Sequence, residues 1–202
     1  MTRRLVLFTA CVLVLGISVP ARAAGAADPA AVIANLGNEA LTVLGKNVDP
    51  NLRVTRFRQL FRQDFDVPDI ARFVLGRYWR LATPAQQQQF VKLLTDYIAL
   101  VYANRLAEYS GETLRVIGTR SEPDGQLVSS EIIRTNGQAP ARVDWLLTPQ
   151  GGTYKINDVR VEGVSMATTE RSEFASVIQR NGGQVQGLIT ALRQKTEGAG
   201  LH

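Results

Sequence analysis

Cysteine and histidine are almost absent from this chain. Its 202 residues include one cysteine, Cys11, and one histidine, His202. A disulfide needs two cysteines, and zinc, copper and haem take most of their protein ligands from cysteine and histidine. The acidic residues Asp64, Asp66 and Asp69 could suggest calcium, but helix capping accounts better for two of them. The sequence therefore predicts no disulfide, no metal site and no cofactor.

A concentrated patch of positive charge is also missing, although the net charge is +5. The chain has 23 lysines and arginines against 18 aspartates and glutamates. Three of the basic residues, Arg3, Arg4 and Arg22, lie close to the N-terminus. The remainder is nearly balanced, and no stretch interleaves basic with aromatic residues. This composition argues against a nucleic-acid partner.

The sequence has a single long apolar run, between Leu5 and Val19. It follows Arg3 and Arg4 and precedes the small residues around Ala23, which is the pattern of a cleavable secretory signal peptide. The run is shorter than the roughly 20 residues that cross a bilayer. We expect residues 1–23 to be the signal peptide, 24–196 a single domain and 197–202 a flexible tail, with the mature protein in the periplasm.

The first part of the mature chain has helical features. Residues 32–48 predict a first helix, and Asp49-Pro50 supplies a capping aspartate and a proline suited to the first turn of a second, which reaches about residue 64. Asp66-Val67-Pro68-Asp69 repeats this arrangement before a short helix that ends at Gly76. Thr83-Pro84-Ala85-Gln86 then has the features of a capping box.

After that box, apolar residues recur at spacings of three and four, which is typical of an amphipathic helix. They are Phe90, Leu93, Leu94, Tyr97, Ile98, Val101, Tyr102 and Leu106. The predicted helix ends near residue 111. From periodicity alone this stripe is more often ordinary core than the wall of a ligand site.

Past Gly111 the pattern changes to β-rich runs at 113–119, 126–134, 141–148 and 153–162. Glycine-containing turns separate them, and such short connections favour an antiparallel meander. Helices at 170–180 and 185–195 follow. Helices first, sheet next and helices last predict an α+β fold, with helices packed on one face of a curved four-stranded antiparallel sheet.

The fourth run leaves two arrangements open. Tyr154 and Ile156 are in one alternation phase, whereas Val159 and Val161 are in the other. Either a β-bulge lies near Asn157-Asp158, or both faces of the strand are covered.

One short segment resembles a catalytic motif. Gly163-Val164-Ser165-Met166-Ala167 lies between a predicted strand and a helix, as the nucleophile elbow of serine hydrolases does, but its last glycine is replaced by Ala167. A serine nucleophile needs a base, normally histidine, and His202 is the terminal residue. We therefore expect a turn at Gly163, a helix cap from Ser165 or Thr168, and no enzymatic activity.

Several stretches together resemble the periplasmic phospholipid-binding protein of the Mla pathway, also called the toluene-tolerance or ABC-transporter auxiliary family. The resemblance covers about residues 57–193. It is carried by Phe65-Asp66-Val67, Ile70-Ala71, Val74-Leu75-Gly76-Arg77-Tyr78-Trp79-Arg80, Ala82-Thr83-Pro84-Ala85-Gln86, Val161-Glu162-Gly163-Val164-Ser165-Met166 and Arg171-Ser172-Glu173-Phe174.

The resemblance implies a shuttle that carries phospholipid between an outer-membrane lipoprotein–porin complex and an inner-membrane ABC transporter complex. Lipid tails would lie in an apolar pocket enclosed by the helices and the sheet. The residues expected to line that pocket are Val74, Leu75, Tyr97, Val101, Tyr102, Val143, Trp145, Tyr154, Ile156, Val164, Met166 and Phe174. Two alternatives stay open: a carrier of another apolar lipid such as a hopanoid, and a periplasmic adaptor that binds proteins and no lipid.

Overall fold

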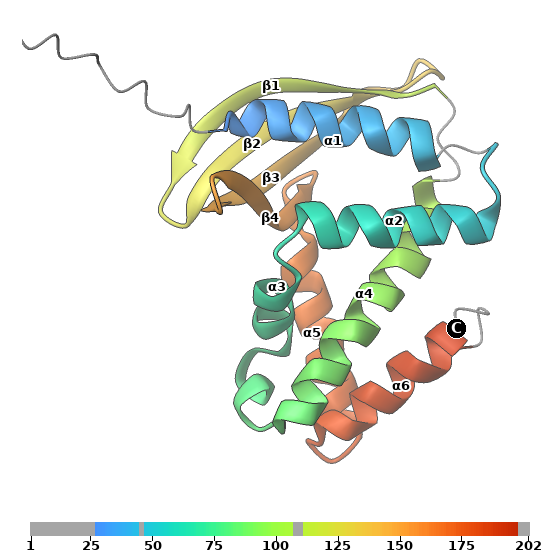
Figure 1. Ribbon diagram of the computed structural model, residues 1–202, viewed down its shortest axis with the longest axis vertical. Helices are drawn as coiled ribbons and strands as arrows, with labels where there is room; N and C mark the ends of the chain where they lie inside the picture. The colour runs from blue at the N-terminus through green and yellow to red at the C-terminus, as the bar shows by residue number, and fades with distance from the viewer. Residues whose placement is uncertain (1–26, 45–46, 107–110, 198–202) are drawn as a thin grey trace, which may run out of the picture.

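The computed structural model describes residues 27–44, 47–106 and 111–197, and within them helices precede and follow a single sheet (Figure 1). The predicted signal peptide and residues 198–202 of the predicted tail lie outside these ranges. The elements, in chain order, are α1 (Pro29–Leu44), α2 (Pro50–Asp64), α3 (Val67–Leu75), the 3-10 helix η1 (Gly76–Arg80), α4 (Pro84–Leu106), β1 (Thr113–Glu122), β2 (Gly125–Ile133), β3 (Ala141–Gln150), β4 (Thr153–Val161), β5 (Val164–Ser165), α5 (Met166–Arg180) and α6 (Val185–Glu197).

The helix starts follow the predicted capping chemistry. The side chain of Asp49 accepts hydrogen bonds from the backbone N–H groups of Asn51 and Leu52, and Asp66 accepts one from Asp69. At the start of α4, Thr83 and Gln86 form both hydrogen bonds of a capping box, at 3.0 and 3.2 Å. These interactions confirm the starts of α2, α3 and α4.

Two helices begin earlier than predicted, and in each case a cap explains the difference. Asp28 accepts a hydrogen bond from the backbone of Ala30, so α1 begins at Pro29 rather than at residue 32. Ser165 caps α5 through the backbone N–H of Thr168 at 3.0 Å, so that helix begins at Met166 rather than at residue 170. The cap at Ser165 and the turn at Gly163, which has a φ of 81°, confirm the interpretation of this segment.

The sheet is an antiparallel meander in the order β1-β2-β3-β4-β5, as the short connections predict. The prediction of four strands misses β5, which has only two residues. Val164 and Ser165 pair with Val161 and Arg160 of β4 through a tight turn. A strand of two residues has no alternation pattern that could be recognised in the sequence.

A β-bulge in β4 brings its two apolar phases onto one face. Trp145 pairs with Val159, Leu146 with Asp158 and Leu147 with Ile156, so Asn157 is the extra residue. Because of this insertion, Ile156 and Val159 both lie opposite residues of the same phase in β3. The structure thus confirms the first of the two arrangements that the sequence left open.

The molecule has an upper and a lower part, with separate apolar cores (Figure 1). In the upper part, α1 and α2 lie under the curved sheet, and Ile33, Leu36, Leu60, Val128, Leu147 and Ile156 form the buried core there. In the lower part, α3, α4, α5 and α6 pack around a second core that includes Leu75, Phe90, Leu94, Phe174, Ile178 and Leu188. Helix α4 extends between the two.

Polar interactions fasten these parts together. An ion pair of 2.7 Å joins Arg58 on α2 to Asp96 on α4. The backbone N–H of Asp66, where α2 ends and α3 begins, donates to the carbonyl of Ile156 on β4 at 3.0 Å. Over residues 27–44, 47–106 and 111–197, no helix combines the length and the apolar character that crossing a membrane requires.

Candidate functional site

A cavity of about 1010 Å³ lies between the sheet and the helices. Ligand sites for small molecules typically enclose about 300–1,000 Å³, so this cavity is at the upper end of that range. Most of its lining is apolar. The apolar wall comprises Leu36, Ala40, Phe57, Leu60, Phe61 and Phe65 on α1 and α2 or after them, Ile70, Val74, Leu94, Ile98, Tyr102 and Leu106 on α3 and α4, Leu114, Ile132, Val143, Trp145, Val159 and Val161 on the strands, and Met166 and Ala167 on α5.

Aromatic rings form a continuous part of this wall. Phe57 stacks on Phe61 with ring centroids 6.3 Å apart and on Tyr102 of α4 at 6.5 Å, and Phe61 lies 4.7 Å from Phe65. Phe57, Phe61 and Phe65 follow one another at four-residue spacing, which places them on one face of α2 and its end. These rings join α2 to α4 across the cavity.

On the sheet side of the wall, a serine accepts the hydrogen bond of a half-buried indole N–H. Trp145 donates from Nε1 to Ser130 Oγ at 2.9 Å, and Ser130 donates to the carbonyl of Val143 at 3.0 Å. Because pairing residues of adjacent strands share a face, Ser130, Val143 and Trp145 all lie on the cavity side. With its N–H satisfied, the tryptophan presents an apolar ring to the cavity.

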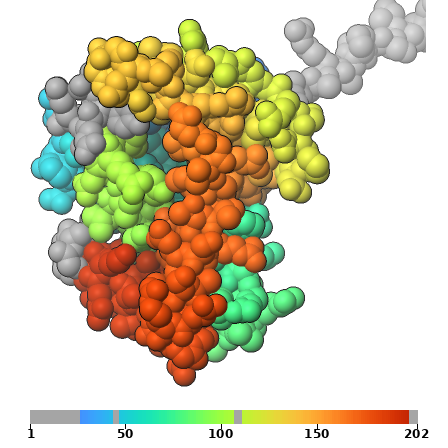
Figure 2. Space-filling model, turned by 180° about the vertical axis from the view of Figure 1, so that it is seen from behind, coloured from blue at the N-terminus to red at the C-terminus, as the bar shows by residue number. Residues whose placement is uncertain are grey.

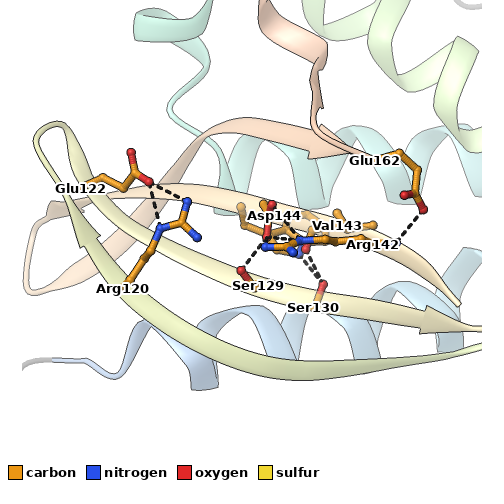
Figure 3. A network of polar contacts seen from close by, with 9 residues as sticks. Arg120, Glu122, Ser129, Ser130, Arg142, Val143, Asp144 and Glu162 are labelled. Carbon is orange, nitrogen blue, oxygen red and sulfur yellow. Dashed lines mark hydrogen bonds and ion pairs between the residues drawn. The ribbon is translucent and has the colours of Figure 1, made fainter.

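The opposite phase of the same strands carries a polar network (Figure 3). Ser129 donates to the buried carboxylate of Asp144 at 2.6 Å, and Asp144 is paired with Arg142 at 3.3 Å. The backbone N–H of Arg142 donates to Glu162 at 2.8 Å. Polar groups are therefore gathered on the face of β2 and β3 that points away from the cavity.

Glu112, Asp158 and Glu170 place carboxylates in the cavity lining, and Glu170 is the buried one of the three. Its residue is only 9% exposed, and among the described residues its Oε2 atom has no hydrogen-bond partner. The pKa of Glu170 is raised to about 7, mainly by burial and in addition by the nearby charge of Glu173. Lys195 and Arg105 lower this pKa, but not enough to offset the burial.

Glu170 also affects the neighbouring tyrosines of α4. Burial, followed by the charge of Glu170, raises the pKa of Tyr97 to about 12, and the same two causes raise the pKa of Tyr102. Both phenols stay neutral near pH 7. The hydroxyl of Tyr102 lies 3.6 Å from the sulfur of Met166, so it contributes a largely satisfied and uncharged surface to the cavity.

The raised pKa of Glu170 predicts a pH-dependent cost to stability. A folded-state pKa above the ordinary value of 4.5 means that the folded chain binds this proton more tightly than the unfolded chain. The destabilisation by ionised Glu170 is absent below about pH 4.5, grows between about pH 4.5 and about pH 7, and is fully present above about pH 7. Glu170→Gln should therefore be more stable than the wild type at pH 8 by about 2 kcal/mol, with little difference at pH 4.5.

Urea denaturation of the purified chain at both pH values measures this difference. Glu173→Gln is the matched control, because Glu173 is exposed on the same helix and does not line the cavity. Equal stability gains for Glu170→Gln at pH 4.5 and at pH 8 would contradict the assignment.

The structure brings five of the predicted site residues together at the cavity. Val74 of α3 and Tyr102 of α4 lie on the helical side. Val143 and Trp145 of β3 lie on the sheet side, and Met166 begins α5 between them. These residues come from four elements distant in sequence.

The other seven predicted site residues lie outside the cavity lining. Leu75, Tyr97, Val101 and Phe174 face the lower core, Tyr154 and Ile156 belong to the upper core, and Val164 is 56% exposed on β5. Adjacent residues of a helix point about 100° apart, so Val74 reaches the cavity while Leu75 does not. The long helix likewise divides its apolar residues between the two parts of the molecule.

Sequence reasoning did not select several important wall residues. Phe57, Leu60 and Phe61 follow the i, i+3, i+4 spacing of an apolar helix face, and this signal could have placed them on the wall. Val159 and Val161 require knowledge of the bulge. No sequence pattern distinguishes Glu170 from an ordinary exposed glutamate.

The chemistry that this arrangement offers is apolar enclosure. Ser165 uses its hydroxyl oxygen to cap α5 and lies 3.0 Å from the hydroxyl of Thr168. Across the described ranges, no three cysteine, histidine, aspartate or glutamate side chains form a group that could hold a metal ion.

Comparisons with known proteins identify a family. A family model described as MlaC protein matches residues 35–194. Toluene tolerance protein ttg2D of Pseudomonas putida is 27% identical over 184 residues, which cover 88% of this chain and 85% of that protein. The intermembrane phospholipid transport system binding protein MlaC of Haemophilus influenzae is 26% identical over 125 residues, covering 60% of this chain and 58% of that protein.

A solved structure is also similar. It is the phospholipid-binding protein from Ralstonia solanacearum in complex with a phospholipid, with a TM-score of 0.71 and 26% sequence identity. The superposition covers 85% of this chain and 98% of that one. Because the family model spans most of the sequence, from residue 35 to residue 194, this chain belongs to the MlaC family.

Proposed function

We propose that this protein is a periplasmic phospholipid carrier that holds acyl chains in the cavity between its sheet and its helices. The observation that carries the proposal is the cavity itself, about 1010 Å³ in volume and lined mainly by apolar and aromatic side chains. Family membership and the relatives named for phospholipid binding and transport support it.

The apolar wall has a direct energetic role in such a carrier. Each methylene group that leaves an apolar environment for water costs about 0.8 kcal/mol, so a lipid with two long chains cannot cross the periplasm unshielded at a useful rate. A cavity of aliphatic and aromatic groups replaces the bilayer as the environment of the chains. Because the cavity and the bilayer are similar in polarity, the direction of transfer must come from partner complexes.

We propose that the lipid contacts are made by the cavity residues that sequence and structure agree on, Val74, Tyr102, Val143, Trp145 and Met166. The aromatic surface of Phe57 and Phe61 extends this wall on the helical side. The polar network behind β2 and β3 faces away from the chains, which keeps the sheet soluble on its outer side.

We further propose that the protein exchanges lipid with an inner-membrane ABC transporter complex and an outer-membrane lipoprotein–porin complex. The family resemblance supports these partners, and the predicted signal peptide of residues 1–23 supports a periplasmic location. Cleavage should give a mature chain that begins at Ala24 or Gly25. Intact mass of the protein from the periplasmic fraction measures the cleavage site, and an uncut chain in the membrane fraction would contradict it.

The decisive test of the carrier is to identify what co-purifies with it. The mature protein, purified from the periplasm without detergent, should release phospholipid on organic extraction, in an amount comparable to the protein. Mass spectrometry identifies the lipid. A hopanoid or another apolar lipid in its place would assign the cavity to a different cargo, and protein free of any lipid would favour an adaptor.

A further inference from the structure

The buried carboxylate of Glu170 is a feature of the cavity that acyl chains do not explain. It lies on the wall beside Tyr102, Met166 and Ala167, in the part of α5 that is closest to the sheet. Its Oε2 atom is buried and has no hydrogen-bond partner within the described ranges. A buried carboxylate oxygen without a donor is costly, and such a group in a ligand cavity indicates that a donor arrives with the ligand.

Two positive charges act on Glu170 without being paired to it, Arg105 in the cavity lining and Lys195 outside it. Arg105, on the last turn of α4, also lines the cavity, and its guanidinium lies 5.1 Å from the ring centre of Tyr102. Lys195 of α6 lies 5.2 Å from the ring centre of Tyr97. Over the described residues, neither cation forms an ion pair with Glu170 within 4.0 Å, although both act on its charge.

Glu170 and Arg105 mark an edge of the cavity that reaches the surface. Both line the cavity, and Glu170 is buried whereas Arg105 is exposed. Figure 2 shows this side of the molecule, where the end of α4 lies beside the upper part of α5 beneath the sheet. A lipid whose chains fill the apolar interior would place its headgroup at such a polar edge.

We propose that Glu170 binds the ammonium group of a zwitterionic phospholipid headgroup, while Arg105 faces its phosphate, so that this edge selects lipids with a primary amine. An ammonium supplies the hydrogen-bond donor that Oε2 lacks, and a charge-assisted bond of this kind is stronger than a neutral one. A phosphate matches the planar, permanently charged guanidinium of Arg105. A headgroup with hydroxyls and no cation would leave Glu170 without a countercharge.

Several neighbouring groups bear on the pH dependence of this site. Glu173 on the same helix opposes ionisation of Glu170, and Arg105 and Lys195 from α4 and α6 favour it. On β4, Asp158 accepts a hydrogen bond from the backbone of Ala167 and is paired with Arg160 at 3.6 Å. On α3, Asp69 accepts a hydrogen bond from Asn157 of β4.

Glu170 is therefore the group expected to titrate at this edge near neutral pH. It is charged at pH 8 and largely neutral at pH 6, because burial raises its pKa to about 7. The selection of amine lipids should accordingly be strong at pH 8 and weak at pH 6.

The inference rests on the proposed lipid carrier, and the experiment separates the two. Delipidated full-length mature protein is incubated with vesicles of equimolar phosphatidylethanolamine and phosphatidylglycerol, re-isolated, and its bound lipids are quantified by mass spectrometry. The wild type should take up phosphatidylethanolamine preferentially at pH 8. Glu170→Gln, which keeps the shape of the side chain, should lower the bound ratio about tenfold without abolishing uptake.

Controls make the role of Glu170 specific. Glu173→Gln removes one negative charge from the same helix outside the cavity and should leave the ratio unchanged. The pH profile of the wild type needs no variant, and its ratio at pH 6 should approach that of Glu170→Gln. An identical ratio in wild type and Glu170→Gln at pH 8, or an equal loss in Glu173→Gln, would overturn the headgroup site while leaving the carrier intact. Absence of uptake of either lipid by the wild type would overturn both proposals.

Discussion

Replacing Val143 with glutamate is expected to yield a folded protein that carries no phospholipid. Val143 is only 3% exposed, and an unpaired carboxylate in a packed core usually unfolds a domain. Val143, however, borders a cavity of about 1010 Å³, which gives the new carboxylate room for water when the cavity is empty. Acyl chains would have to displace that water, so lipid binding is lost while the fold remains.

The matched control is Val128→Glu. Val128 is the same residue type, is fully buried, and pairs with Trp145 on the adjacent strand, but it lies in the upper core and does not line the cavity. Its carboxylate has no space to hydrate, and the substitution should cost about 4 kcal/mol or more, or roughly 10 °C in Tm. Circular-dichroism melting and co-purified phospholipid distinguish the two variants. A folded Val143→Glu with normal lipid content would show that Val143 is not part of the lipid wall.

Phe90→Ala should cause a large loss of stability while leaving the cavity intact. Phe90 is fully buried in the lower core, and its ring meets that of Phe174 edge to face at 5.8 Å. Truncating a buried phenylalanine costs about 3–5 kcal/mol, because it removes apolar burial and leaves a void. Lipid content of the protein that remains folded should match the wild type, since Phe90 does not line the lipid cavity.

Phe73→Ala is the control for this effect. Phe73 belongs to the same lower part of the molecule, but it is 43% exposed, and the guanidinium of Arg171 lies 5.1 Å from its ring centre. Its truncation should cost about 1 kcal/mol. Urea denaturation at fixed pH measures both values. A comparable cost for the two variants would contradict the assignment of the lower core as the main source of stability.

The fold was largely predictable because its local signals are strong. The aspartate and threonine caps placed three helix starts, and the glycine turns gave the order of the antiparallel sheet. The bulge was recognised only as one of two possibilities, because a phase change between Ile156 and Val159 also fits a strand that is covered on both faces. The strand at Val164 and Ser165 is too short to leave a pattern.

The site was predictable only in part, because a helix stripe does not say which neighbour it faces. Tyr97 and Tyr102 belong to one apolar stripe of α4, yet Tyr97 packs in the lower core and Tyr102 lines the cavity. That division depends on where α2, α5 and α6 contact α4, which is a tertiary property. Glu170 could not be identified for the same reason, since only the packed structure makes its carboxylate buried and unpartnered.

The separation of the two apolar cores has a consequence for how the protein tolerates change. Val74 and Leu94 of the lower core also line the cavity, but Phe90, Phe174, Ile178 and Leu188 do not, so this core keeps much of its stabilising contact whether cargo is present or absent. Substitutions that widen or narrow the cavity under the sheet then change mainly how much cargo it can hold. The packing of the lower core keeps the chain folded when such substitutions cost some stability. Cargo size in this architecture is open to variation over generations, because much of the packing that holds the lower part together lies outside the residues that set that size.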